Sequence, residues 1–214
     1  MLVSRFDLGN GGLLLQWKLG AMENFTYLIV DEAVGVASLI DPGWDSDFIL
    51  AELDNLSCSL ESVLLTHHHF DHVDALGGVL KSFPRARVYA TAQEKSYYNL
   101  EYVNETLNDG DFIKVGSIKV QCVLTPGHTS GSCCYFVADK YLCTGDTLFV
   151  DSCGRCDLEG GSAYDMQSSL KKIVSSFSDD TVILPGHKYD DERDQDTLAN
   201  QKRTNYYLRF NHEL

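Results

Sequence analysis

Four side chains of metal-binding type lie within six residues of this sequence: His67, His69, Asp71 and His72. Imidazole and carboxylate groups at this spacing favour a metal site over an ordinary histidine-rich surface loop. The apolar run 63–65 precedes them and predicts a short buried strand. Apolar residues at helical spacing follow them and predict a helix from Asp71 to Lys81. A strand-to-helix turn therefore positions the cluster, with the first two histidines directed at one metal and the other two groups at a neighbouring position.

Three further residues of metal-binding type occur in one repeated setting. His128, Asp146 and His187 each lie at the end of a predicted strand, and each directly follows a glycine. Glycine lets the backbone turn sharply and approach a bound ion closely. The repetition indicates that these three residues join the first cluster.

Strands and helices of ordinary length are predicted around these residues. Strands are predicted at 11–19, 24–30, 34–40, 87–91 and 181–184, and hairpins at 112–124 and 132–146. Helices are predicted at 45–56, 92–100, 162–177 (with Ser162 as the cap) and 190–207. The acidic run 190–196 is interpreted as a solvated face of the last helix rather than a second metal site. No repeat, low-complexity tract or long linker is present, which predicts a single domain over residues 1–214.

Composition narrows the class of protein. The net charge of −14 argues against a general nucleic-acid partner or an anionic membrane surface. The first residues lack the layout of a signal peptide, and no apolar run is long enough to span a bilayer. Seven cysteines, an odd number, fit reduced thiols better than a disulfide framework. We therefore expect a cytoplasmic protein; its oligomeric state is left open.

The motifs resemble those of a known family. The pattern H-x-H-x-D-H at 67–72, followed by Gly-His, Gly-Asp and Gly-His, resembles the metallo-β-lactamase superfamily. The stretches TPGHTSGS, GDTLFVDSCGR and LPGHKYD resemble its glyoxalase II branch, the hydroxyacylglutathione hydrolases. This resemblance extends from Asn24 to about Tyr189 and implies an α/β fold, an αββα sandwich with metals at one edge. Because only about 25 residues follow Tyr189, it implies a form without the C-terminal helical domain of that branch.

The resemblance also implies a ligand set and a reaction. One metal ion would be bound by His67, His69 and His128, and a second by Asp71, His72 and His187, with Asp146 bridging the two. The implied cofactors are two divalent ions, zinc before iron or manganese. A hydroxide bridging them would attack an acyl thioester of glutathione, coenzyme A or a carrier protein. Asp71 and Asp146 are the residues expected to serve catalysis as well as metal binding.

Substrate contacts are implied by the same motifs. Arg155 corresponds to a residue that pairs with an anion on the thiol half of the substrate. Tyr189 corresponds to a tyrosine that hydrogen-bonds substrate in relatives. The Cys153-x-x-Cys156 pair is interpreted as an accident of its loop, and Lys188 as a surface residue. Whether the basic residues near the C-terminus reach the site is left open; these are Lys202, Arg203 and Arg209.

A second activity on the same fold stays open at this point. Persulfide dioxygenases, which this pattern also resembles, share the ligand-bearing positions but bind a single iron. In this sequence the corresponding iron ligands would be His67, His128 and Asp146. The lactam-cleaving branch fits less well because it generally lacks an aspartate at the position of Asp146. A non-catalytic protein on this fold would normally have lost ligands, and here none is lost.

Overall fold

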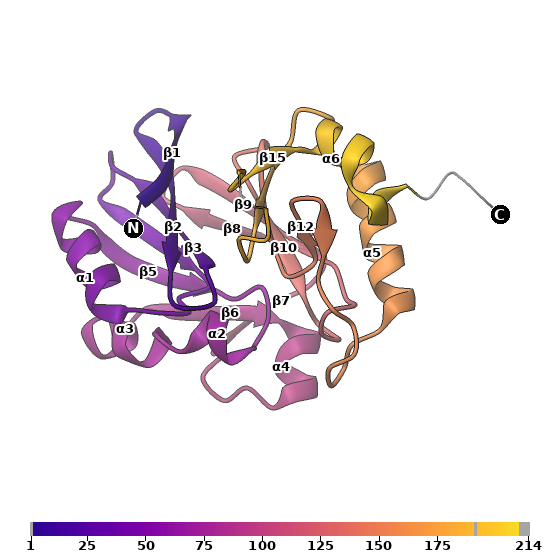
Figure 1. Ribbon diagram of the computed structural model, residues 1–214. Coiled ribbons are helices and arrows are strands. Elements are labelled where there is room, and N and C mark those ends of the chain that lie inside the picture. The colour runs from indigo at the N-terminus through magenta and orange to yellow at the C-terminus, as the bar shows by residue number, and fades with distance from the viewer. Residues whose placement is uncertain (1, 191, 210–214) are drawn as a thin grey trace.

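Two β-sheets pack face to face in the computed structural model, which describes residues 2–190 and 192–209 (Figure 1). The first sheet has seven strands in chain order: β1 (Leu2–Gly9), β2 (Gly12–Leu19), β3 (Asn24–Asp31), β4 (Val36–Ile40), β5 (Ser59–Leu64), β6 (Arg87–Thr91) and β7 (Glu105–Leu107). The second has the order β15-β14-β11-β10-β9-β8, with β8 (Phe112–Val115), β9 (Ile118–Leu124), β10 (Cys133–Val137), β11 (Tyr141–Gly145), β14 (Val182–Pro185) and β15 (Asp196–Thr197). A small hairpin pairs β12 (Leu148–Phe149) with β13 (Ser152–Cys153).

Helices cover the outer faces of both sheets (Figure 1). They are α1 (Ser46–Asn55), α2 (Phe70–Val73), α3 (Leu76–Ser82), α4 (Ala92–Tyr98), α5 (Ala163–Ser176) and α6 (Leu198–Thr204), with a 3₁₀ turn at Tyr206–Leu208. In the view of Figure 1, α1 and α3 lie on the left beside the first sheet, and α5 and α6 lie on the right beside the second. None of the helices within the described ranges is long and apolar enough to cross a membrane.

Strand β3 explains why the sandwich holds together. Its side chains alternate between the two faces of the sheet, as in any strand. Ile29 points into the core between the sheets, whereas Leu28 and Val30 pack in the outer core with Ile49 and Leu53 of α1. Both faces are therefore buried, which is why β3 carries an almost unbroken apolar run. The αββα arrangement expected from the resemblance is confirmed.

The predicted helix at 162–177 is confirmed, including its start. The Ser162 hydroxyl accepts a hydrogen bond from the Asp165 backbone N–H, which satisfies one of the free donors at the helix N-terminus. Met166, Leu170 and Ile173 share one face of α5 and pack in the core beneath the second sheet. This helix forms one wall beside the site described below.

The single helix predicted from Asp71 to Lys81 is wrong in one respect. The structure divides it into α2 and α3, with a break at Asp74 and Ala75. The Ala75 backbone N–H donates to the Pro42 carbonyl at 3.1 Å instead of to the preceding turn of its own helix. The turn at 41–43 thus separates two segments that share one apolar periodicity.

The helix predicted over 190–207 is also wrong for its first half. The chain runs through a loop to β15, which pairs with β14, and α6 begins only after its cap, Thr197. Asp190 accepts hydrogen bonds from the Glu192 and Arg193 backbone N–H groups, a local turn that competes with helix formation. Part of the acidic run is thus paired with Arg193, whose guanidinium bonds Asp190, Asp196 and Asp151. Position 191 lies outside the described residues.

Candidate metal centre

The seven predicted ligands follow strands whose carboxyl ends meet at one edge of the sandwich. His67 and His69 lie in the loop after β5, and Asp71 and His72 lie on α2, which continues that loop. His128, Asp146 and His187 follow β9, β11 and β14 of the second sheet. These three strands run in the same direction, because β11 is parallel to β14 and β10 is antiparallel to both β9 and β11. Ligands from both sheets therefore converge.

The converging side chains form two groups of three. In the first group, His67, His69 and His128 each offer a ligand atom within 4.8 Å of the others, and the second group of Asp71, His72 and His187 meets the same limit. Asp146 lies between the groups: its carboxylate oxygens are 3.4 Å from Nε2 of His128 and 3.2 Å from Nε2 of His72. The structure thus brings together the residues that the sequence assigned to each metal.

A short hydrogen-bond relay orients His67. The Thr66 hydroxyl donates to Oδ2 of Asp41 at 2.6 Å, so its oxygen is free to accept from Nδ1 of His67 at 3.0 Å. Burial, and then the neighbouring His72, hold the pKa of His67 well below its usual value, so the ring is neutral. Its Nε2 then carries a lone pair, and this buried atom has no hydrogen-bond partner among the described residues. That is the state that a metal requires of a histidine ligand.

Backbone carbonyls orient two other histidines. Nδ1 of His128 donates to the Arg155 carbonyl at 2.7 Å, and Nδ1 of His187 donates to the Met22 carbonyl at 3.1 Å. In both rings Nε2 is therefore the atom that faces the cluster. Burial, and then the adjacent His128, lower the pKa of His69 to about 4, which leaves this ring neutral at pH 7 as well.

Asn24, at the start of β3, holds the second group together. Its side-chain amide donates to Oδ2 of Asp71 at 2.9 Å and to the Asp71 carbonyl at 3.0 Å. The indole N–H of Trp44 donates in turn to the Asn24 side-chain oxygen at 2.7 Å. Because each group has a fixed partner, the Asp71 carboxylate is held in one orientation.

The cluster keeps both of its carboxylates ionised. Burial raises the pKa of Asp146, but His72 and His187 outweigh it and hold that pKa well below its usual range. Asp71 follows the same pattern: burial opposes ionisation, yet His187, His72 and Asn24 lower its pKa to about 2. Conversely, burial lowers the pKa of His72, while Asp146 and Asp41 outweigh it and raise that pKa to about 10.

This donor set fits divalent metal ions. Imidazole and ionised carboxylate suit zinc, iron or manganese, and a bound cation would take the place of the proton that His72 holds beside Asp146 and Asp41. The buried lone pair on His67 is directed into the cluster, and the imidazole nitrogens of His72 and His187 lie only 3.2 Å apart. Five histidines and two carboxylates packed this closely are more easily explained by shared cations than by hydrogen bonds alone.

Glycines permit two of the close approaches. A side chain at Gly186 would place its Cβ 2.4 Å from Oδ1 of Asp146, so the residue before His187 must be small. A Cβ at Gly154 would lie 1.8 Å from the Asp146 carbonyl, which is how the loop at 151–157 reaches His128. At Gly154 and Gly186 glycine is therefore required by lack of space.

Two buried acids contribute to the centre although the sequence did not mark them as functional. Asp41 accepts from the Thr66 backbone N–H at 2.8 Å as well as from the hydroxyl, and it also faces His72. Glu94, on α4, accepts from the His68 backbone N–H at 3.0 Å and from the Gly131 N–H at 3.0 Å. Glu94 therefore ties the loop of His67 and His69 to the loop of His128.

His68 points away from the metal ligands, as the sequence predicted. Its Nδ1 donates to Oε1 of Glu94 at 2.7 Å, and its ring stacks on Tyr98 with 3.7 Å between ring centroids. His68 thus packs against α4 and stabilises the loop that carries His67 and His69.

A cavity of about 1120 Å³ opens onto the cluster. Arg155 and Tyr189, to which the resemblance assigns substrate binding, both line it. The Arg155 guanidinium is exposed and pairs with Asp157 at 2.6 and 2.8 Å, while the Tyr189 ring packs on Phe149 with 4.6 Å between centroids. Both side chains are therefore available to a bound molecule.

The remaining candidates divide between the cavity and the surface. Arg209 lines the cavity, whereas Lys202 pairs with Asp179 at 2.7 Å and Arg203 bonds Asn200. Lys188 is partly exposed, pairs with Asp194 at 2.7 Å and does not line the cavity. Cys153 and Cys156 line the cavity as free thiols, and burial raises the pKa of Cys153 to about 11. A thiol with so high a pKa is a poor nucleophile, which agrees with an incidental C-x-x-C.

Comparison with known proteins places this geometry in a family. Residues 19–187 match the profile of the Metallo-beta-lactamase superfamily. The chain is 38% identical over 167 residues to the probable polyketide biosynthesis zinc-dependent hydrolase PksB of Bacillus subtilis, covering 78% of this chain and 73% of PksB. It is 33% identical over 179 residues to the probable hydroxyacylglutathione hydrolase glo2 of Schizosaccharomyces pombe, covering 81% of this chain and 66% of glo2.

A solved structure gives the same answer for the fold. ETHE1 from Myxococcus xanthus superposes with a TM-score of 0.82 at 33% identity, covering 90% of this chain and 83% of that one. The extent of the profile match and the identity to curated relatives agree with the two-sheet architecture described above. The chain belongs to the metallo-β-lactamase superfamily.

Proposed function

We propose that this protein is a metal-dependent hydrolase of acyl thioesters. The observation that carries the proposal is the pair of three-ligand groups with Asp146 between them. His67, His69 and His128 would hold one divalent ion, and Asp71, His72 and His187 the other. When bound, two such ions supply a hydroxide nucleophile at neutral pH and a Lewis acid for the thioester carbonyl.

The residues of the chain determine charge and orientation at this centre. Asp71 and Asp146 stay ionised, so they would balance the charge of divalent cations held at this centre. Asp41, acting through His72 and through Thr66, fixes the ligand rings on both sides. Because the rings are already oriented, little reorganisation is needed as the substrate reacts.

The proposed reaction consumes one water and needs no oxidant. A C–O bond forms at the thioester carbonyl carbon, the C–S bond breaks, and the products are a carboxylic acid and a thiol. Thiolates are far better leaving groups than alkoxides, since thiol pKa values lie near ~8.5. A strong general acid beside the sulfur is therefore unnecessary, and Arg155 and Tyr189 are free to bind the thiol half.

The curated relatives support hydrolysis. Both PksB and glo2 are described as hydrolases, the first zinc-dependent and the second acting on hydroxyacylglutathione. The two names differ in substrate, so they favour the reaction type more than any one thiol carrier.

The likeness to ETHE1 favours a second candidate, a persulfide dioxygenase with one iron at His67, His128 and Asp146. Such an enzyme would consume O₂ as a co-reactant. The second group of Asp71, His72 and His187 does not separate the two candidates, because persulfide dioxygenases share these ligand-bearing positions.

Metal content decides between the two candidates. Plasma mass spectrometry on freshly purified protein should give close to two metal ions per chain, mostly zinc, and a thioester panel should then reveal turnover. One iron per chain with little zinc, together with oxygen uptake on addition of a persulfide, would overturn the hydrolase assignment.

A further inference from the structure

The cavity beside the metal centre has an apolar rim. Twelve large hydrophobic side chains are exposed among the described residues, and six of them line this one cavity. We call these six the apolar rim: Met22, Phe70, Leu158, Tyr189, Tyr206 and Tyr207. Exposed apolar side chains scattered singly need no explanation, but their concentration around a functional cavity marks a binding surface.

The floor of the cavity is apolar as well. Phe149, Met166 and Leu170 line it, and all three are almost completely buried. Met166 and Leu170 belong to the inward face of α5, so the cavity extends from the metal ligands along this helix. Its volume of about 1120 Å³ exceeds that of most small-molecule sites, which run roughly from 300 to 1,000 Å³.

Apart from the side chains of the metal centre, the charged residues described as lining the cavity are positive. Among the described lining residues the only carboxylates are the metal ligands Asp71 and Asp146, whereas Arg155 and Arg209 supply two cations. This contrasts with the chain as a whole, whose net charge is −14. A cavity with a metal end, apolar walls and arginines matches a molecule with a reactive carbonyl, an apolar body and an anionic end.

We propose that the cavity binds thioesters whose acyl group is a long apolar chain. The acyl chain lies against the apolar rim and the floor, and the anionic group of the thiol half pairs with Arg155. This inference rests on the proposed thioester hydrolysis and names the part of the substrate that selects it. A short polar acyl group would leave most of the apolar lining unused.

Binding of unreactive analogues tests the proposal. The probes are two series of thioethers, S-alkyl glutathiones and S-alkyl coenzyme A, each from butyl to decyl, titrated into the metal-loaded protein by calorimetry. Each methylene that is buried should tighten binding about two- to fourfold in both series. The slope with chain length reports the acyl site whichever thiol half the protein prefers.

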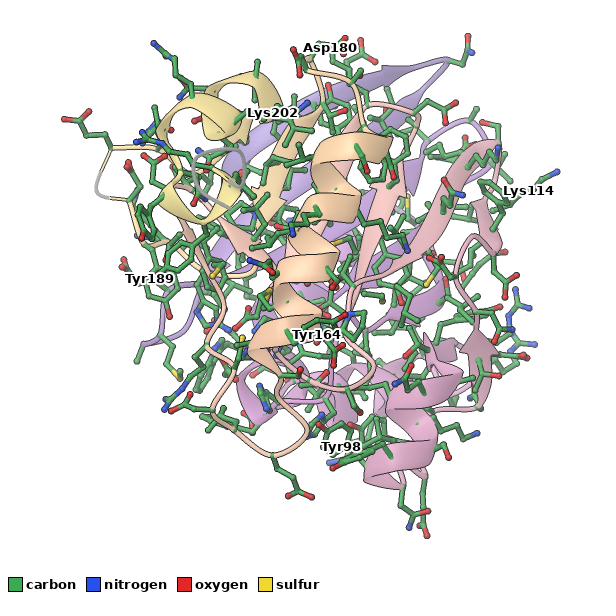
Figure 2. All side chains as sticks on the ribbon, turned by 90° about the vertical axis from the view of Figure 1, so that its right-hand side faces the viewer. Tyr98, Lys114, Tyr164, Asp180, Tyr189 and Lys202 are labelled. Atoms are coloured by element: carbon green, nitrogen blue, oxygen red, sulfur yellow. The ribbon has the colours of Figure 1, made fainter. Side chains whose placement is uncertain are left out.

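A matched pair of tyrosines supplies the control. Tyr206 and Tyr164 are equally exposed, at 79%, but only Tyr206 lines the cavity. Figure 2 shows Tyr164 at the lower end of α5 and Tyr189 at a separate edge of the molecule. Tyr206→Ala should weaken decyl thioether binding about tenfold and butyl binding far less, because most of the lost contact is with the distal carbons. Tyr164→Ala should change neither.

The outcomes separate this inference from the proposed function. Steep chain-length slopes without hydrolysis of any thioester would keep the apolar site and overturn the reaction. Hydrolysis of short thioesters with flat slopes in both series would keep the reaction and overturn the apolar site. Equal effects of Tyr206→Ala and Tyr164→Ala would also overturn it, since the rim would then make no specific contact.

Discussion

Oδ2 of Asp41 lies 3.0 Å from Nδ1 of His72, and both groups are buried. The same carboxylate accepts the Thr66 hydroxyl, whose oxygen faces His67. One acid therefore orients a histidine from each of the two ligand groups. Groups that hold a ligand ring in place commonly contribute 10- to 100-fold to metal affinity.

Asp41→Asn should accordingly lower metal affinity about 10- to 100-fold, because an amide places a donor against a group that already donates. Competition with a chelator measures the affinity. Asp31 is the matched control: it is also buried and accepts from the backbone N–H and hydroxyl of Ser117. Asp31→Asn should cost stability and leave metal affinity unchanged, and an equal loss of affinity in both variants would exclude the role given to Asp41.

Glu94 should act as a positioning residue for the first ligand group. Glu94→Ala leaves the His68 and Gly131 N–H groups without their acceptor, so the two ligand loops can separate. We expect about a tenfold loss of metal affinity, with partial recovery in Glu94→Gln, which keeps one acceptor oxygen. A lower melting temperature with unaltered metal affinity would show that Glu94 serves the fold alone.

Ligands and their neighbour should differ sharply on substitution. His69→Ala or Asp146→Ala should abolish turnover and reduce the metal content, whereas His68→Ala should keep most activity because its ring faces Glu94 and Tyr98. Metal analysis and thioester turnover on the same preparations check this. Strong activity in Asp146→Ala would be incompatible with its place between the two groups.

Arg155 should affect substrate binding more than chemistry. Arg155→Ala should raise KM for an anionic thioester about tenfold with little change in kcat, because it removes binding shared by the ground and transition states. Asp157→Asn should act in the opposite direction, since it releases the guanidinium from its present partner. An unchanged KM in Arg155→Ala would move the anion-binding site elsewhere.

Much of the fold was predictable because each element carries a local signal. The strand at 87–91, the strands of the hairpin at 112–124 and the capped helix α5 have these bounds within a residue. The errors at Ala75 and at 190–197 arose where distant or side-chain hydrogen bonds override periodicity. Strand β1 was missed because Ser4 and Arg5 interrupt its apolar residues, although Val3, Phe6 and Leu8 pack against the core between the sheets.

The residues of the site also divide into those that local sequence patterns predict and those that they do not. The ligands could be predicted because they follow strands and are grouped in short motifs. Asp41 and Glu94 could not, because their importance depends on contacts 25 to 37 residues away in the sequence. Asp41 looks like a turn former before proline, and Glu94 looks like an ordinary first-turn helix acid. A local sequence pattern does not indicate hydrogen-bond partners that lie so far away in the sequence.

The division of the ligands between the two sheets has a consequence for folding during synthesis. The loop after β5 carries four ligands in the first sheet, and the other three belong to the second, with His72 and His187 115 residues apart in the chain. Before the second sheet has been synthesised, a chain emerging from the ribosome can offer an ion only the first four ligands. Metal ions that bind to the complete centre would therefore bind tightly only after the two sheets have docked, and their binding would stabilise the assembled sandwich.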